Sequence, residues 1–218
     1  MEQLQWSYSS LKDFIGCPKR YQETKVLKNY EFKPTEATTY GNKVHSALEN
    51  YVKESTPLPL NYQRFEGYVK ALLELEGEKL TEHHMALDIK GSPCKWGAKE
   101  RWVRGIADLL IINGNHARIV DYKTGSERYP DPDQLKLMAL LTFSHYPEIE
   151  KIDAALFFVV HDVIVDESYT RDQIAELWGV FYPHLERLKM SFEKNTWPEN
   201  PTALCRFCPV VTCKFNKE

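Results

Sequence analysis

Residues 100–123 read ERWVRGIADLLIINGNHARIVDYK, two apolar runs on either side of Asn113 and Gly114. Asn-Gly between apolar runs is typical of a tight hairpin turn. We therefore predict a strand over 100–112, a turn at 113–115 and a partner strand over 117–123. Asp108 lies in the first run, and Asp121 and Lys123 lie in the second. Because strand side chains alternate, Asp121 and Lys123 should point the same way, about 6–7 Å apart along the backbone.

The pattern around this hairpin predicts an α/β fold. Apolar residues at helical spacing predict helices over 7–15, 41–53, 62–80 and 133–143, and a continuous apolar run predicts a buried strand over 152–160. Thr170–Gln173 resembles a capping box that begins a long helix to about Lys194. This order favours a mixed central β-sheet flanked by helices. We expect one domain over 1–218, with a core at about 41–194 and flanking segments at about 7–30 and 197–218.

Composition limits the class of protein. A chain of 218 residues with 43% hydrophobic content can bury the core of one domain. The formal net charge of −3 gives no overall basic field, which counts against a DNA-packaging protein but not against an enzyme with a local basic groove. The sequence shows no signal-peptide pattern and no apolar run of membrane-spanning length. We therefore expect a cytoplasmic protein, in which clustered cysteines bind metal more often than they form disulfides.

The two aspartates are candidate ligands of a divalent metal ion. Carboxylates hold hard cations such as Mg²⁺, which lower the pKa of bound water and compensate the charge of a phosphodiester. Asp108 and Asp121 would bind the ion with the backbone carbonyl of Tyr122, and Lys123 would orient the attacking water or stabilise the phosphate. His45 would complete the shell and favour tolerance of Mn²⁺. Taken singly, each residue more often has a structural role; the ordered set favours catalysis.

The cysteines indicate a second metal centre. Cys205, Cys208 and Cys213 are closely spaced near the C-terminus, which suits several thiolates on one soft metal. Cys17, directly before Pro18, is the natural fourth ligand, whereas Cys94 is expected to be no ligand. Spacing alone does not separate zinc from an iron–sulfur cluster, and free thiols are a further alternative.

Two other groups of residues concern the binding of DNA and of metal. Lys19, Arg20 and Tyr21 combine two cations with an aromatic ring, a set that neutralises phosphates and stacks on bases of single-stranded DNA. The alternative is a solvated helix end with Tyr21 packed in the core. His83 and His84 are adjacent on an expected strand, so they should face opposite ways and form no metal pair. Glu82 beside them could lie near the site, but it is not among the metal ligands that we expect.

These motifs resemble the RecB-type branch of the PD-(D/E)XK nuclease superfamily. The matching segments are Gly41-x-x-Val-His45, Gly105-Ile-x-Asp108, Val120-Asp-Tyr-Lys-Thr-Gly125 and a helix that contains Gln134. The resemblance implies a restriction-endonuclease-like core in which His45, Asp108 and Asp121 bind metal and Lys123 is the catalytic lysine. It also implies that Gln134 contacts the site or the DNA. The family's tyrosine, four residues after this glutamine, is replaced here by Met138.

The resemblance also implies a function. It implies a metal-dependent DNA nuclease, most simply an exonuclease on single strands or duplex ends, of bacterial, archaeal or phage origin. The early cysteine segment resembles that of members with a [4Fe–4S] cluster, which favours such a cluster on Cys17, Cys205, Cys208 and Cys213 over zinc. Partners would be DNA and proteins of replication, recombination or CRISPR adaptation. The alternative is a non-catalytic DNA-binding or complex-assembly protein that keeps the fold.

Overall fold

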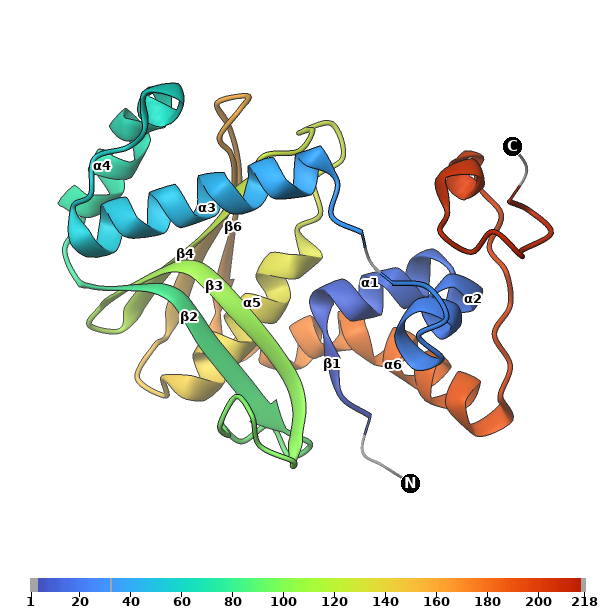
Figure 1. The fold of residues 1–218 in the computed structure, drawn as a ribbon. Helices are drawn as coiled ribbons and strands as arrows, with labels where there is room; N and C mark the ends of the chain where they lie inside the picture. Colours follow the sequence, from blue (N-terminus) through green and yellow to red (C-terminus); the bar gives the residue numbers. More distant parts are fainter. Residues whose placement is uncertain (1–3, 32, 217–218) are drawn as a thin grey trace. The chain divides into compact units, whose positions relative to one another are not determined.

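The computed structural model describes residues 4–31 and 33–216. Backbone packing divides the chain into two units (Figure 1): Pro34–Trp178, and the segment up to Lys33 together with the segment from Gly179. Helix α6 (Ile174–Lys194) continues from the first unit into the second. The single nuclease domain expected from the sequence stays a prediction.

A mixed sheet forms the centre of the unit 34–178. Its strands are β2 (Glu78–Asp88), β3 (Arg101–Asn113), β4 (His116–Lys123), β5 (Lys151–Phe158) and β6 (Val163–Thr170), arranged in that order. The pairs are antiparallel except β4–β5, which is parallel and is connected through helix α5 (Asp133–His145). The predicted hairpin at 100–123 is confirmed, with the turn at Gly114.

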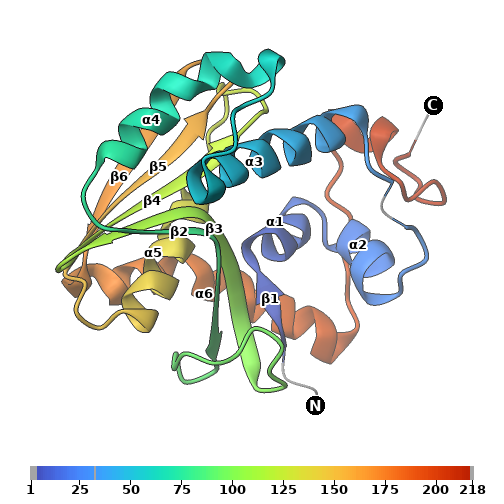
Figure 2. The ribbon, with the colours of Figure 1, turned by 60° about the vertical axis from the view of Figure 1, so that its left-hand side comes forward.

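Helices cover both faces of this sheet (Figure 2). Helix α3 (Glu36–Glu54) and helix α4 (Glu66–Glu74), preceded by a 3₁₀ turn (Leu60–Phe65), lie on one face, and α5 lies on the other. Val44 and Leu48 of α3 belong to the same buried cluster as Leu109, Val120 and Tyr122 of the sheet. The predicted mixed sheet between helices is therefore confirmed.

Two predicted elements differ from the structure. The helix predicted over 62–80 is wrong beyond Glu74, because the chain turns at Gly77 and enters β2 at Glu78. Gly77 has a φ of 122°, in the left-handed region that favours glycine, and a Cβ there would collide with the backbone of Ile112. Strand β6 was not predicted. Most of its side chains are exposed or half-buried, so its apolar signal is weak.

The other unit brings the N-terminal segment and the C-terminal tail together. It contains the two-residue strand β1 (Trp6–Ser7), helix α1 (Tyr8–Gly16) capped by Ser7, helix α2 (Pro18–Tyr21), a π-helical turn (Gln22–Val26) and a 3₁₀ turn (Ala203–Phe207). The Tyr21 ring stacks on Trp197, with ring centroids 6.1 Å apart. The backbone N–H of Lys19 donates to the carbonyl of Pro198 at 3.2 Å. Protein contacts alone therefore join the segments that carry the cysteines.

Among the helices of the described residues, none has the length and apolarity needed to cross a lipid bilayer.

Candidate active site

The site forms where strands β3 and β4 separate. Their backbone pairing ends at Leu109 and Val120, directly beside Asp108 and Asp121. A carboxylate oxygen of Asp108 accepts a hydrogen bond from the backbone N–H of Tyr122 at 2.7 Å. The side chain of Asp108 thus replaces a backbone contact at the fork. Both predicted carboxylates are brought to the same point by the hairpin.

His45 reaches this fork from helix α3. Its Nδ1 lies 3.3 Å from Oδ2 of Asp108. Burial acts to lower the pKa of His45, but the hydrogen bond to Asp108 and the charges of Asp108 and Asp121 outweigh it, so the pKa is raised. The imidazole therefore sits in a negative environment that would favour a cation.

Asp121, Lys123 and Gln134 form a connected group. Lys123 Nζ lies 2.5 Å from Oδ2 of Asp121 and donates to Oε1 of Gln134 at 2.8 Å. The Gln134 amide in turn donates to Oδ1 of Asp121. The expectation that Asp121 and Lys123 share one side of the strand is met by these contacts. The Tyr122 side chain faces the other way and is buried in the cluster under α3.

Asp121 has an unusually high pKa for an aspartate. It is only 3% exposed, and burial, followed by the neighbouring charge of Asp108, raises its pKa to about 6 despite the opposing effect of Lys123. Oδ2 of Asp121 lies against the Lys123 ammonium and has no other polar partner among the described residues. A buried carboxylate with an oxygen in this state is suited to bind a cation.

Glu82, which is not among the ligands expected from the sequence, also lies at the site. It lies on β2 directly across from Asp108, between the pairs Thr81–Leu109 and His83–Ala107. One ligand atom each of His45, Glu82 and Asp108 lie within 4.8 Å of one another. Its φ of 45° is rare for a residue with a side chain. Burial, then the charges of Asp108 and Glu49, raise its pKa. The signal in the sequence that could have indicated Glu82 is an acidic residue on the strand beside β3.

These residues fit a divalent metal ion. The donor set of carboxylate oxygens and one imidazole nitrogen is the set that Mg²⁺ and Mn²⁺ accept. His45, Glu82 and Asp108 already stand at the spacing of a shared ligand sphere. Asp121 is outside this closest group because Lys123 and Gln134 hold its oxygens.

Helix α5 is held tightly against β3, which fixes Gln134. A Cβ at Gly105 would collide with Met138 and would lie 2.7 Å from Cδ1 of Leu141. A side chain at position 105 would therefore require the Met138 and Leu141 side chains to move. Met138, which stands at the family's tyrosine position, is buried there, so in this chain the position serves packing between α5 and β3.

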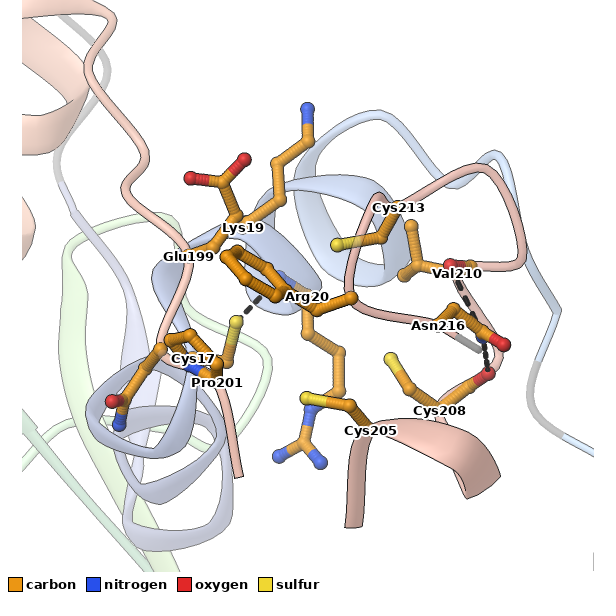
Figure 3. Close-up of a pocket in the computed structure, with 12 residues that line it drawn as sticks. Cys17, Lys19, Arg20, Glu199, Pro201, Cys205, Cys208, Val210, Cys213 and Asn216 are labelled. Carbon is orange, nitrogen blue, oxygen red and sulfur yellow. Dashed lines mark hydrogen bonds between the residues drawn. The ribbon is translucent and has the colours of Figure 1, made fainter. Parts of the chain in front are cut away.

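The four predicted cysteine ligands line one pocket of the other unit (Figure 3). The sulfurs of Cys17, Cys205, Cys208 and Cys213 surround a common space, into which the Arg20 side chain extends. Cys17 Sγ accepts a hydrogen bond from the backbone N–H of Arg20 at 3.5 Å. All five cysteines are free thiols, and Cys94, which belongs to the unit 34–178, does not line this pocket.

The predicted DNA-binding residues beside Cys17 are only partly available. Tyr21 is buried, 6% exposed, and packs against Phe14 and Trp197, so the predicted stacking of Tyr21 on a base is wrong and the core alternative holds. Lys19 pairs with Glu23 at 2.8 Å and Arg20 pairs with Asp13 at 3.2 Å. The two cations are partly exposed, so they alone remain candidates for phosphate contacts.

Comparison with known proteins agrees with the family suggested by the motifs. Residues 5–213 match the sequence model of the PD-(D/E)XK nuclease superfamily. No curated protein matches the chain. Two crystal structures are similar to the chain, and the first of them supports the fold. A "putative exonuclease" from Eubacterium rectale has 16% identity and a TM-score of 0.53, with 99% of this chain and 87% of that chain covered. SSO0001 has 14% identity and a TM-score of 0.42, with coverages of 100% and 90%. The sequence match extends over nearly the whole length, and the chain therefore belongs to the PD-(D/E)XK nuclease superfamily.

Proposed function

We propose that this nuclease is a metal-dependent deoxyribonuclease that works as an exonuclease on single-stranded DNA or duplex ends. The observation that carries the proposal is the gathering of His45, Glu82 and Asp108 beside the Asp121–Lys123 pair. The exonuclease mode is supported by the motif resemblance and by the description of the Eubacterium rectale neighbour as an exonuclease.

The metal would be Mg²⁺ or Mn²⁺, held by His45, Asp108 and Asp121 with the backbone carbonyl of Tyr122, and we add Glu82 to this set. Such an ion supplies a water of lowered pKa and charge compensation at the phosphate. Asp108 is preset for this role, because the N–H of Tyr122 fixes its carboxylate. Asp121 would turn one oxygen from Lys123 or Gln134 toward the ion, because these two side chains hold both of its oxygens in the structure.

Lys123 and Gln134 would position the reaction. The ammonium of Lys123 is held between Asp121 and Gln134, so it cannot swing into solvent without breaking both contacts. In that place it orients the attacking water for in-line attack on the phosphorus and stabilises negative charge that develops on the phosphate. Gln134 acts through Lys123 and Asp121 and is therefore a positioning residue.

The pocket of Cys17, Cys205, Cys208 and Cys213 would hold a [4Fe–4S] cluster, with zinc as the alternative. Four thiols from two distant parts of the chain surround one space, and iron–sulfur clusters take four cysteine thiolates. The backbone N–H of Arg20 toward Cys17 and that of Thr202 toward Cys205, at 3.3 Å, resemble donors that stabilise thiolates. Such a centre would join α2 to the tail. We also propose that the protein works with protein partners in replication, recombination or CRISPR adaptation.

The proposal is tested with oligonucleotides labelled separately at the 5′ and 3′ ends, incubated with Mg²⁺, Mn²⁺ or EDTA. We expect shortening from an end with either metal and none with EDTA. Lys123→Ala and Asp121→Asn should lower the rate by at least about 100-fold, because each removes stabilisation made in the transition state.

A matched control is Asp153→Asn. Asp153 is a β5 carboxylate that pairs with His116 at 2.8 Å, away from the fork, and its loss should leave cleavage unchanged. Cleavage by Lys123→Ala at the wild-type rate would refute the site. Absence of any divalent-dependent product with wild-type protein would favour the non-catalytic alternative.

A further inference from the structure

The face of the sheet that carries Asp108 continues along β2 and β3 away from the fork. Gly105 faces α5, because a Cβ there would collide with Met138. Met85, paired with Gly105, also faces α5, where its sulfur accepts a hydrogen bond from Thr142. Since strand side chains alternate, His84 and Arg104 point to the opposite face, on which His45 contacts Asp108.

On this face three side chains form a stacked triad: His84, Trp96 and Arg104. The rings of His84 and Trp96 are stacked, with centroids 4.3 Å apart and planes at 21°. The guanidinium of Arg104 lies 4.7 Å from the centroid of the Trp96 ring. His84 pairs with Ile106 and Ala86 pairs with Arg104, so the two strand residues are diagonal neighbours beneath one indole. His83 points the other way, to the hydroxyl of Tyr146, as the sequence predicts for two adjacent strand histidines.

The loop that carries Trp96 is anchored to the strands. The Asp88 carboxylate accepts hydrogen bonds from the backbone N–H groups of Lys90 and Ser92 at 2.8 and 2.9 Å. The N–H of Cys94 donates to the carbonyl of Ala86 at 3.0 Å. Arg101 donates to the carbonyl of Trp96 itself. The indole is therefore preset over β2 and β3, which lowers the entropic cost of binding to it.

The triad remains accessible and lies in a basic segment. His84 is exposed, and Trp96 and Arg104 are half-buried. Residues 88–104 contain five lysines and arginines against two acids, whereas the whole chain is net acidic. An aromatic platform with a fixed cation in a basic surrounding is the arrangement that holds single-stranded nucleic acid without sequence preference.

The triad and the active site lie at a fixed spacing along strand β3. Arg104 precedes Asp108 by four strand residues, about 13 Å, which is the length of about four stacked nucleotides. We propose that the stacked triad is a subsite for the substrate strand, in which a base stacks on the indole of Trp96, supported from beneath by His84, and a phosphate pairs with Arg104. This inference rests on the proposed nuclease function, because the DNA substrate of such a nuclease would be the strand that reaches from the triad to the metal ligands.

The test measures binding without cleavage. Fluorescence anisotropy in EDTA follows the binding of a labelled oligothymidine of about 12 nucleotides. Trp96→Leu should weaken binding about 5- to 100-fold, the usual loss for one stacked base, while Trp96→Phe should restore most of it. Arg104→Gln should reduce the slope of log affinity against log salt by about one, whereas Arg118→Gln on β4 should match the wild type.

Thermal unfolding checks that each variant folds, and if Trp96→Leu does not, the salt slope of Arg104→Gln decides. Wild-type affinity and salt slope in both Trp96→Leu and Arg104→Gln, with a wild type that cleaves DNA, would overturn the subsite and leave the nuclease proposal intact. A wild type that neither binds nor cleaves any oligonucleotide would overturn both.

Discussion

Asp121 influences both the chemistry of the proposed active site and the stability of the folded protein. Its carboxylate is buried between Lys123 and Gln134, close to the charge of Asp108, and its pKa is raised from 3.8 to about 6. A raised pKa means that ionising Asp121 opposes folding. The folded state holds this proton between about pH 4 and 6 while the unfolded chain has lost it, so stability falls as pH rises through this window.

The pH dependence of Asp121→Asn tests this charge. In metal-free protein at pH 7.5, the substitution should raise the free energy of unfolding by about 1–3 kcal/mol, because it removes a buried charge. At pH 4 most of the gain should be lost, since Asp121 is then protonated in the folded state and partly protonated in the unfolded chain. Urea unfolding at the two pH values, with Asp153→Asn as the control, measures the difference. Destabilisation by Asp121→Asn at pH 7.5 would show that the pair with Lys123 outweighs burial.

Sequence patterns could predict the site residues that lie in local motifs. Asp121 and Lys123 follow from strand alternation, and Asp108 follows from the hairpin that places it at the same fork. Glu82 could not be found this way. Its role depends on the register of β2 against β3 and on a positive φ, neither of which is written in a short motif. Tyr21 failed for a related reason, because burial is set by packing against Phe14 and Trp197.

At the scale of elements, strong local signals predicted structure well. The Asn-Gly turn fixed the β3–β4 hairpin, and the capping box at Thr170 was found in place before α6. The signals failed where tertiary contacts decide. Residues 78–80 join a strand because the chain turns at Gly77 and pairs with β3, although their apolar spacing also suits a helix. Strand β6 pairs with β5 while exposing most of its side chains, so little periodicity marks it.

Helix α5 shows how one element serves both packing and chemistry. Its buried face places the Met138 and Leu141 side chains against Gly105, while Gln134, one turn before Met138, reaches Lys123 and Asp121. The replacement of the family's tyrosine by methionine therefore changes the packing side of the helix and leaves the glutamine contact in place.

At the scale of the whole molecule, the chain has two centres in two units. The carboxylate site lies in the unit 34–178, and the cysteine pocket lies in the unit built from both chain ends. The units are connected through the backbone at Lys33–Pro34 and through α6. On the proposed function, the first centre would take a hard, exchangeable ion and the second a soft, tightly held metal.

Removal of one cysteine tests the second centre. Anaerobically purified wild type should show visible thiolate-to-iron absorption and about four iron atoms per chain. Cys205→Ala should lose the colour, while Cys94→Ala, outside the pocket, should keep it. Colourless wild-type protein with one zinc ion per chain would replace the cluster with the zinc alternative.

The most direct test of the active site is calorimetric titration of Mn²⁺ into metal-free protein. Wild type and Asp153→Asn should bind Mn²⁺ with equal affinity, because Asp153 is remote from the fork. Asp108→Asn combined with Asp121→Asn should abolish measurable binding while the protein stays folded, since two carboxylate ligands are lost. Binding of Mn²⁺ to the double variant with wild-type affinity and stoichiometry would contradict the central claim that these side chains share one metal ion.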